Sequence, residues 1–270
     1  MAVQDLELAP SFRVGQVLGK SLSIWFKNLL PFGLLGVVFN IPVAILGYLM
    51  FEELVPIQQQ IALGQPADPA LVQHIFGWGF WAGWVVFVIC YQLLTAAIAY
   101  GVVQRLRGQT VSLVGCFGQA FGRFFPIIFT GLAAAILTWL ACLLLVIPGI
   151  IVALNFYVAI PVCIIEGLGV SGSLSRAKEL ARGYRWRLLG IILVAAVIAV
   201  VIQQLLGVII RLAVPAHMEL TNLIYMSVGT LMINQVIFTT LVAAIATCAY
   251  YYLRVAKEGV DIDQIAAVFD

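Results

Sequence analysis

The sequence predicts an all-α, polytopic integral membrane protein, with six transmembrane helices arranged as three hairpins and a cytoplasmic, interfacial amphipathic helix before each hairpin. The first observation is compositional: of 270 residues, 63% are hydrophobic and 10% are charged, whereas about 25% are charged in an ordinary soluble domain. The second is that charge-free apolar runs of about 20 residues, the length that crosses a bilayer, recur along the chain. The third is that basic residues collect in alternate connections. This composition excludes most soluble enzymes.

The predicted spans contain no Asp, Glu, Lys or Arg, and together they fill a single membrane domain, residues 1–270. They cover approximately residues 29–51, 75–103, 124–147, 149–165, 188–210 and 223–253. Only Pro148-Gly149 separates the third span from the fourth, and because this pair favours a turn we predict a tight hairpin there. One continuous helix would instead give five spans and move the C-terminus to the other side.

Charge placement predicts the orientation, because Lys and Arg concentrate in cytoplasmic loops. With six spans and a cytoplasmic N-terminus, Arg211 is the only one of the 14 basic residues that lies outside, while the first outer connection carries Glu52, Glu53 and Asp68. We therefore expect both termini in the cytoplasm and localisation to the bacterial inner (plasma) membrane. The first apolar run starts near residue 29 without a small-residue cleavage site, so we expect no cleaved signal peptide.

Three amphipathic segments, residues 11–27, 111–123 and 170–186, precede the predicted hairpins. In the first, with Ser11 as the expected N-cap, one helical face carries polar and basic side chains: Arg13, Gln16, Lys20, Ser23 and Lys27. Such helices lie in the headgroup layer, and three of them would form a basic collar on anionic lipid. The chain is then either three copies of about 80 to 100 residues, or a chain in which basic loop segments arose independently beside membrane helices.

The spans hold no ionisable Asp, Glu, Lys, Arg or His side chain, which disfavours a proton relay. The five Cys residues form no C-x-x-C pair, and His74 and His217 are isolated, so we expect no metal site and no cofactor. No nucleophile has a base beside it, so we expect no catalytic residues. Four intramembrane amides could line a polar cavity or hydrogen-bond between helices: Asn40, Asn155, Asn234 and Gln235.

The connection after the fourth span is the richest polar region. Glu166 is expected to form a structural ion pair with one of the arginines that follow it. The candidates for binding a lipid headgroup are the basic and aromatic residues of this connection: Arg176, Lys178, Arg182, Arg185, Trp186 and Arg187.

Residues 161–187, reading PVCIIEGLGVSGSLSRAKELARGYRWR, resemble a bacterial integral membrane family, the glycerophosphoryl diester phosphodiesterase membrane domain, together with UPF0259-like membrane proteins. The matching positions are Pro161, Glu166, Gly167, Leu174, Arg176, Leu180, Gly183 and Trp186, followed near the C-terminus by Tyr251, Tyr252, Arg254, Glu258, Gly259 and Asp261. Where that family often has Ser, this chain has Ala177. The resemblance implies a membrane fold and location. The catalytic barrel of the phosphodiesterases has no room beside six spans, so hydrolysis is not expected.

These observations lead us to expect a non-catalytic inner-membrane protein that organises or senses lipid, or a partner protein, through its basic cytoplasmic collar. The expected partners are anionic membrane lipids, and a homo-oligomer or a larger membrane complex stays open. A net charge of +2 is too small for nucleic acid binding. The alternative is a transporter or channel for a small apolar or amphiphilic substrate, with the four amides along its path.

Overall fold

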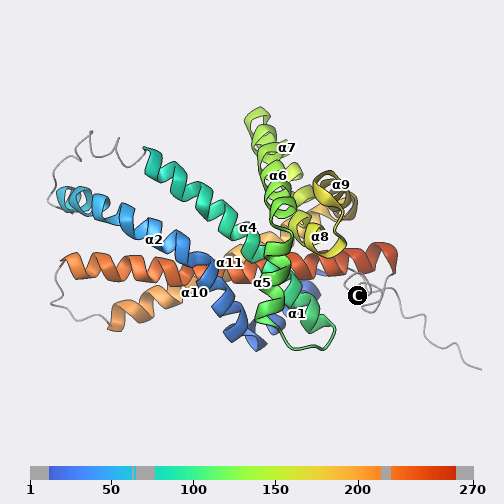
Figure 1. Ribbon diagram of the computed structural model, residues 1–270, viewed down its shortest axis with the longest axis horizontal. Coiled ribbons are helices and arrows are strands. Elements are labelled where there is room, and N and C mark those ends of the chain that lie inside the picture. Colours follow the sequence, from blue (N-terminus) through green and yellow to red (C-terminus); the bar gives the residue numbers. More distant parts are fainter. Residues whose placement is uncertain (1–11, 63, 65–76, 214–219, 260–270) are drawn as a thin grey trace, which may run out of the picture.

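The computed structural model describes residues 12–62, 64, 77–213 and 220–259, and within these ranges every regular element is an α-helix (Figure 1). Six helical stretches are long and apolar enough to cross a membrane, so the predicted all-α class is confirmed at this level. They are Leu29–Leu49, Phe80–Leu106, Phe124–Leu144, Val146–Glu166, Arg185–Ile210 and Gly229–Glu258. Several residues used in the sequence predictions lie outside the described ranges: Ser11, Asp68, His74, His217 and Asp261.

The helices account for most of the described residues. Their bounds are α1 Val14–Lys27, α2 Leu29–Ala62, α4 Trp78–Leu106, α5 Leu113–Gly122, α6 Phe124–Leu144, α7 Val146–Phe156, α8 Ala159–Glu166, α9 Gly169–Ala181, α10 Arg185–Ala213 and α11 Leu220–Glu258. Along the chain, α2 packs against α4, α6 against α7, and α10 against α11. In Figure 1, α11 runs along most of the length of the molecule, α2, α4 and α10 extend toward the end where α11 begins, and α6 and α7 point in a different direction.

The hydrophobic core lies where these helices converge. It is built mainly from the C-terminal halves of α4 and α11, together with α8 and one face of α1. Small side chains let the central helices approach closely; examples are Ala96, Ala97 and Ala99 in α4, and Ala243, Ala244 and Ala249 in α11, all of them buried. The core is therefore at the end of the molecule that carries the basic residues.

The apolar face of α1 is buried within the protein. Its Val17, Ile24 and Trp25 belong to the core, and the Trp25 Nε1–H donates to Thr240 Oγ1 of α11 at 3.1 Å. Arg13 occupies the N-cap position without a side-chain cap. The helix thus lies close to the residues where the sequence predicts it. Its apolar face packs against α11.

The turn between α6 and α7 lies at Leu145, three residues before the predicted Pro148-Gly149 turn. Leu145 has extended backbone angles (φ −163°, ψ 145°), and Pro148 lies in the first turn of α7, where a missing N–H costs little. Gly149 serves a different purpose, because a Cβ there would lie 2.1 Å from Cys142 Sγ. The glycine therefore allows α6 and α7 to touch.

Further boundaries differ from the prediction; α2, for example, continues to Ala62, well beyond the predicted end at residue 51. The fourth span is not one helix, because α7 ends at Phe156 and α8 begins at Ala159. The third amphipathic helix ends at Ala181 rather than at residue 186, since Gly183 has φ 91°, a left-handed conformation that favours glycine. Arg185 and Trp186 consequently belong to the first turn of α10.

Candidate functional site

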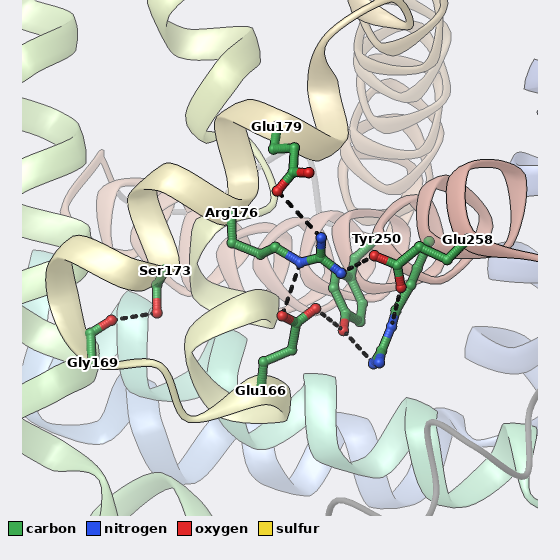
Figure 2. A network of polar contacts seen from close by, with 8 residues as sticks. Glu166, Gly169, Ser173, Arg176, Glu179, Tyr250 and Glu258 are labelled. Atoms are coloured by element: carbon green, nitrogen blue, oxygen red, sulfur yellow. Dashed lines mark hydrogen bonds and ion pairs between the residues drawn. The ribbon is translucent and has the colours of Figure 1, made fainter. Parts of the chain in front are cut away.

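A network of charged side chains joins α8, α9 and the end of α11 (Figure 2). Glu166, the last residue of α8, accepts a hydrogen bond from Arg176 Nε of α9 at 3.0 Å and one from the Tyr250 hydroxyl of α11 at 2.8 Å. The Glu166 side chain is only 10% exposed. Because a carboxylate with so little solvent needs partners, these two bonds satisfy both oxygens of Glu166 at this position.

Arg176 is the centre of the network. Besides Glu166, its guanidinium contacts Glu179 Oε2 at 3.3 Å and forms an ion pair with Glu258. Burial alone would lower the pKa of Arg176, but the hydrogen bond to Glu258 and the charges of Glu166 and Glu258 raise it above its ordinary value. Arg176 is therefore a permanently charged side chain that links α8, α9 and α11.

The end of α11 completes this network. Arg254 donates from Nε to Glu258 Oε2 at 3.0 Å and from its NH1 to the Tyr250 hydroxyl at 3.1 Å, and Lys257 Nζ donates to the backbone oxygen of Glu179. Within the described ranges, no group of His, Cys, Asp and Glu could hold a metal ion. The arrangement links α8 and α9 to the end of α11.

A second contact that links helices, made by Arg123, was not predicted from the sequence. The chain leaves α8 through Gly167, whose φ of 67° is left-handed. Arg123, between α5 and α6, donates from its NH1 to the carbonyls of Ile164 at 3.0 Å and Cys163 at 3.4 Å. A cation at a helix C-terminus satisfies carbonyls that have no partner in the helix and is favoured by the helix dipole. The sequence signal for this role was only a basic residue before an apolar run.

The structure divides the candidate headgroup residues into two groups. Arg176 belongs to the network described above, Arg185 Nε donates to Asn155 Oδ1 of α7 at 2.8 Å, and Arg187 NH1 donates to the backbone oxygen of Phe12 at 3.0 Å. These three side chains hold protein contacts. Lys178, Arg182 and Trp186 face outward, and Trp186 is 82% exposed.

The intramembrane amides do not form one path. Asn234 and Gln235 of α11 line a pocket of about 230 Å³ with Gln203 of α10. Asn40 instead donates to the carbonyl of Gly36 in its own helix at 2.7 Å, and Asn155 accepts the bond from Arg185. Two of the four predicted lining residues therefore come together.

Neither the curated proteins nor the solved structures provide a match to this chain. The family comparison gives one match, to a domain of unknown function, DUF7847, over residues 70–253. That match names neither the glycerophosphoryl diester phosphodiesterase membrane domain nor a UPF0259-like family, so the resemblance of residues 161–187 stays a prediction. The matched region runs from just before α4 to near the end of α11, and it contains Glu166, Arg176 and the basic residues around them. On this match, which covers more than half of its length, the chain belongs to the DUF7847 family.

Proposed function

We propose that this protein is a non-catalytic inner-membrane protein that recognises anionic lipid through its basic segment, residues 178–187. The observation that supports this proposal is that Lys178, Arg182 and Trp186 are exposed at every fourth position of the segment, whereas Arg185 and Arg187 form hydrogen bonds within the protein. Cations at a membrane surface attract anionic headgroups, and an exposed tryptophan prefers the same layer.

The contacts around the basic segment favour recognition by a fixed surface. Arg176 fixes the helix before it, Arg185 is bonded to α7, and Arg187 is bonded to Phe12 and lies over the Tyr184 ring, 5.5 Å from its centre. A surface that is ordered before it binds loses less conformational freedom on binding. The exposed cations are thus presented at little entropic cost.

The proposal includes the finer architecture that the sequence predicts. Both termini would lie in the cytoplasm of a bacterial cell, and the three pairs α2–α4, α6–α7 and α10–α11 would form hairpins, each introduced by an interfacial helix. Arg211 is the only basic residue placed on the outer side, which supports this orientation. Assembly with further copies or other membrane subunits is compatible with this proposal.

Quenching of Trp186 by brominated lipid tests the proposal. The protein would be placed in nanodiscs of neutral phosphatidylcholine with a minor fraction of phosphatidylglycerol, and either lipid would carry the bromine. The Trp186→Phe variant isolates the signal of this residue. We expect stronger quenching by brominated phosphatidylglycerol than by an equal fraction of brominated phosphatidylcholine, and a preference that weakens as salt is added.

Charge variants make this test specific. Each surface cation contributes about 1 kcal/mol, roughly a fivefold preference, so Lys178→Gln and Arg182→Gln should each reduce the preference severalfold. Arg211→Gln removes the same charge from the opposite predicted side and is the matched control. Equal quenching by the two lipids, or an equal effect of the control, would refute lipid recognition by the basic segment.

A second candidate function is transport of a small amphiphilic substrate, and the pocket between α10 and α11 favours it. Three amides line that pocket, and amide groups at membrane depth are costly without polar partners. Uptake into proteoliposomes should then be lost in Asn234→Leu and kept in Asn40→Leu, because the Asn40 amide bonds its own helix. Uptake that both variants retain would exclude this pocket as the path.

A further inference from the structure

The connection between α6 and α7 contains no polar residue. Residues 143–147 are Leu, Leu, Leu, Val and Ile, and each is between 64% and 82% exposed. The other two connections expected on the same side carry charged and polar residues, among them Asp68 and Glu219. A tip of five exposed apolar side chains is unfavourable in water, and soluble surfaces rarely carry such a patch.

The backbone of this tip also suits an apolar surrounding. Only Leu145 leaves the helical conformation, and its N–H still donates to the Ala141 carbonyl at 3.1 Å, while Gly149 N–H donates to the Leu145 carbonyl at 3.2 Å. Pro148 has no N–H that would need a partner. Backbone in hydrocarbon must satisfy its polar groups internally, so a one-residue turn, which leaves fewer of these groups without a partner than a longer loop would, is favoured there.

The outgoing helix of this hairpin, α6, has 21 residues and is long enough to cross a membrane. The part of the returning helical segment that can face lipid is short. After Phe156 the chain enters α8, which packs against α4, α6, α9 and α11, and residues 162–165 are at most 1% exposed. Protein, not lipid, therefore surrounds α8. The 11 residues of α7, at 1.5 Å each, reach about 16 Å, which is roughly half of the hydrocarbon thickness of about 30 Å.

A second, independent observation gives the depth of α7. Asn155, near its end, accepts the bond from Arg185, the first residue of α10, which the exposed Trp186 and then Arg187 follow. Arginine and tryptophan at the start of an apolar helix mark the interface. From Asn155 back to Leu145 is ten residues, or about 15 Å of helix. Figure 1 shows α6 and α7 directed away from the line of α11, so their reach across the bilayer is shorter still if α11 crosses it.

We propose that the α6–α7 hairpin does not cross the bilayer: it enters from the side of the basic residues and ends with its tip, residues 143–147, among the lipid acyl chains. The crossing helices are then α2, α4, α10 and α11. A hairpin that enters and returns leaves both of its ends on one side, as two crossings do. The distribution of Lys and Arg is therefore the same in both topologies, and it cannot distinguish them. This proposal does not depend on headgroup recognition by the basic segment.

Cysteine labelling in intact cells and in inverted vesicles tests the topology. A cysteine is introduced in full-length protein carrying Cys142→Ala, and the same protein without the new cysteine gives the background. Leu145→Cys reports the tip, Ala67→Cys and Ala216→Cys report the two other connections, and Ser171→Cys reports α9. The reagent is a charged maleimide that does not cross membranes.

We expect Ala67→Cys and Ala216→Cys to react from one side, Ser171→Cys from the other, and Leu145→Cys at least tenfold more slowly than these from either side. A nitroxide on Leu145→Cys should be more accessible to oxygen than to a water-soluble nickel chelate, which also shows that a slow reaction reflects hydrocarbon and not misfolding. Labelling of Leu145→Cys together with Ala67→Cys would mean that the hairpin crosses, and labelling with Ser171→Cys would mean that the tip lies in water. Either result overturns the proposal, whereas reversed sides for the controls alone would refute only the proposed orientation.

Discussion

Removing the Arg176 guanidinium should destabilise the protein by leaving Glu166 without its cation. Arg176→Gln keeps a polar but shorter and uncharged side chain, and it removes the ion pairs with Glu166, Glu179 and Glu258. Loss of one partner of a fully buried pair costs about 3–5 kcal/mol. Here the two side chains keep 20% and 10% exposure, and Glu258 retains Arg254. We therefore expect a loss of about 2–3 kcal/mol in the free energy of unfolding, after allowing for solvent screening.

Reversible unfolding by dodecyl sulfate in mixed micelles measures this change. Arg182→Gln removes the exposed arginine that directly follows α9, and it should change the free energy of unfolding by less than about 0.5 kcal/mol. The double variant Glu166→Gln, Arg176→Gln should be more stable than Arg176→Gln alone, because it contains no unpaired carboxylate at this position. An Arg176→Gln variant as stable as Arg182→Gln, or a double variant less stable than either single one, would refute the proposed role of the pair.

Two further substitutions test helix contacts by the same titration. Gly149→Ala should destabilise the protein by about 1–3 kcal/mol, because the new Cβ would lie 2.8 Å from Cys142 Cα, a backbone atom that cannot move independently. In the control Gly118→Ala the new Cβ meets nothing within 4 Å, so this change should be neutral or stabilising. Equal losses of stability in the two variants would contradict the contact between Gly149 and Cys142. Trp25→Phe should lower the free energy of unfolding by about 1–2 kcal/mol, because the hydrogen bond and part of the ring volume are lost. The double variant Trp25→Phe, Thr240→Val should lose less than the sum of the two single losses. Strict additivity would mean that the bond between Trp25 and Thr240 contributes nothing.

The long helices could be predicted because their signal is local. An apolar run without charge is recognisable whatever lies next to it in space. The start of α6 and both ends of α10 therefore lie within a few residues of the predicted positions. The α6–α7 turn was misplaced for a related reason. The pair Pro148-Gly149, taken alone, is typical of a turn. Proline is also common in the first turn of a helix, and Gly149 is needed for the contact with Cys142. A local pattern cannot separate those uses.

Partner choice could not be predicted, because it depends on packing between distant segments. Glu166 has five arginines or lysines within the following 21 residues, and the fold selects Arg176 and adds Tyr250 from 84 positions away. Asn40 and Asn155 resemble Asn234 in sequence context, since each is an amide in an apolar run. They differ only in what lies beside them: a backbone carbonyl, an arginine, and a pocket.

The partner of each charged side chain determines how strongly that charge can attract anionic lipid. The network contains three cations and three carboxylates, so its formal charge is zero: Arg176, Arg254 and Lys257 against Glu166, Glu179 and Glu258. Paired charges produce a weak field beyond their own size, whereas an unpaired exposed cation acts over about a Debye length, roughly 8 Å in physiological salt. The attraction of this region for anionic lipid should therefore come from the cations that no carboxylate of the network neutralises, which are Lys178, Arg182, Arg185 and Arg187. Removing the network should alter stability before it alters lipid preference. A change of both by the same variants would mean that the fold and the binding surface are one unit.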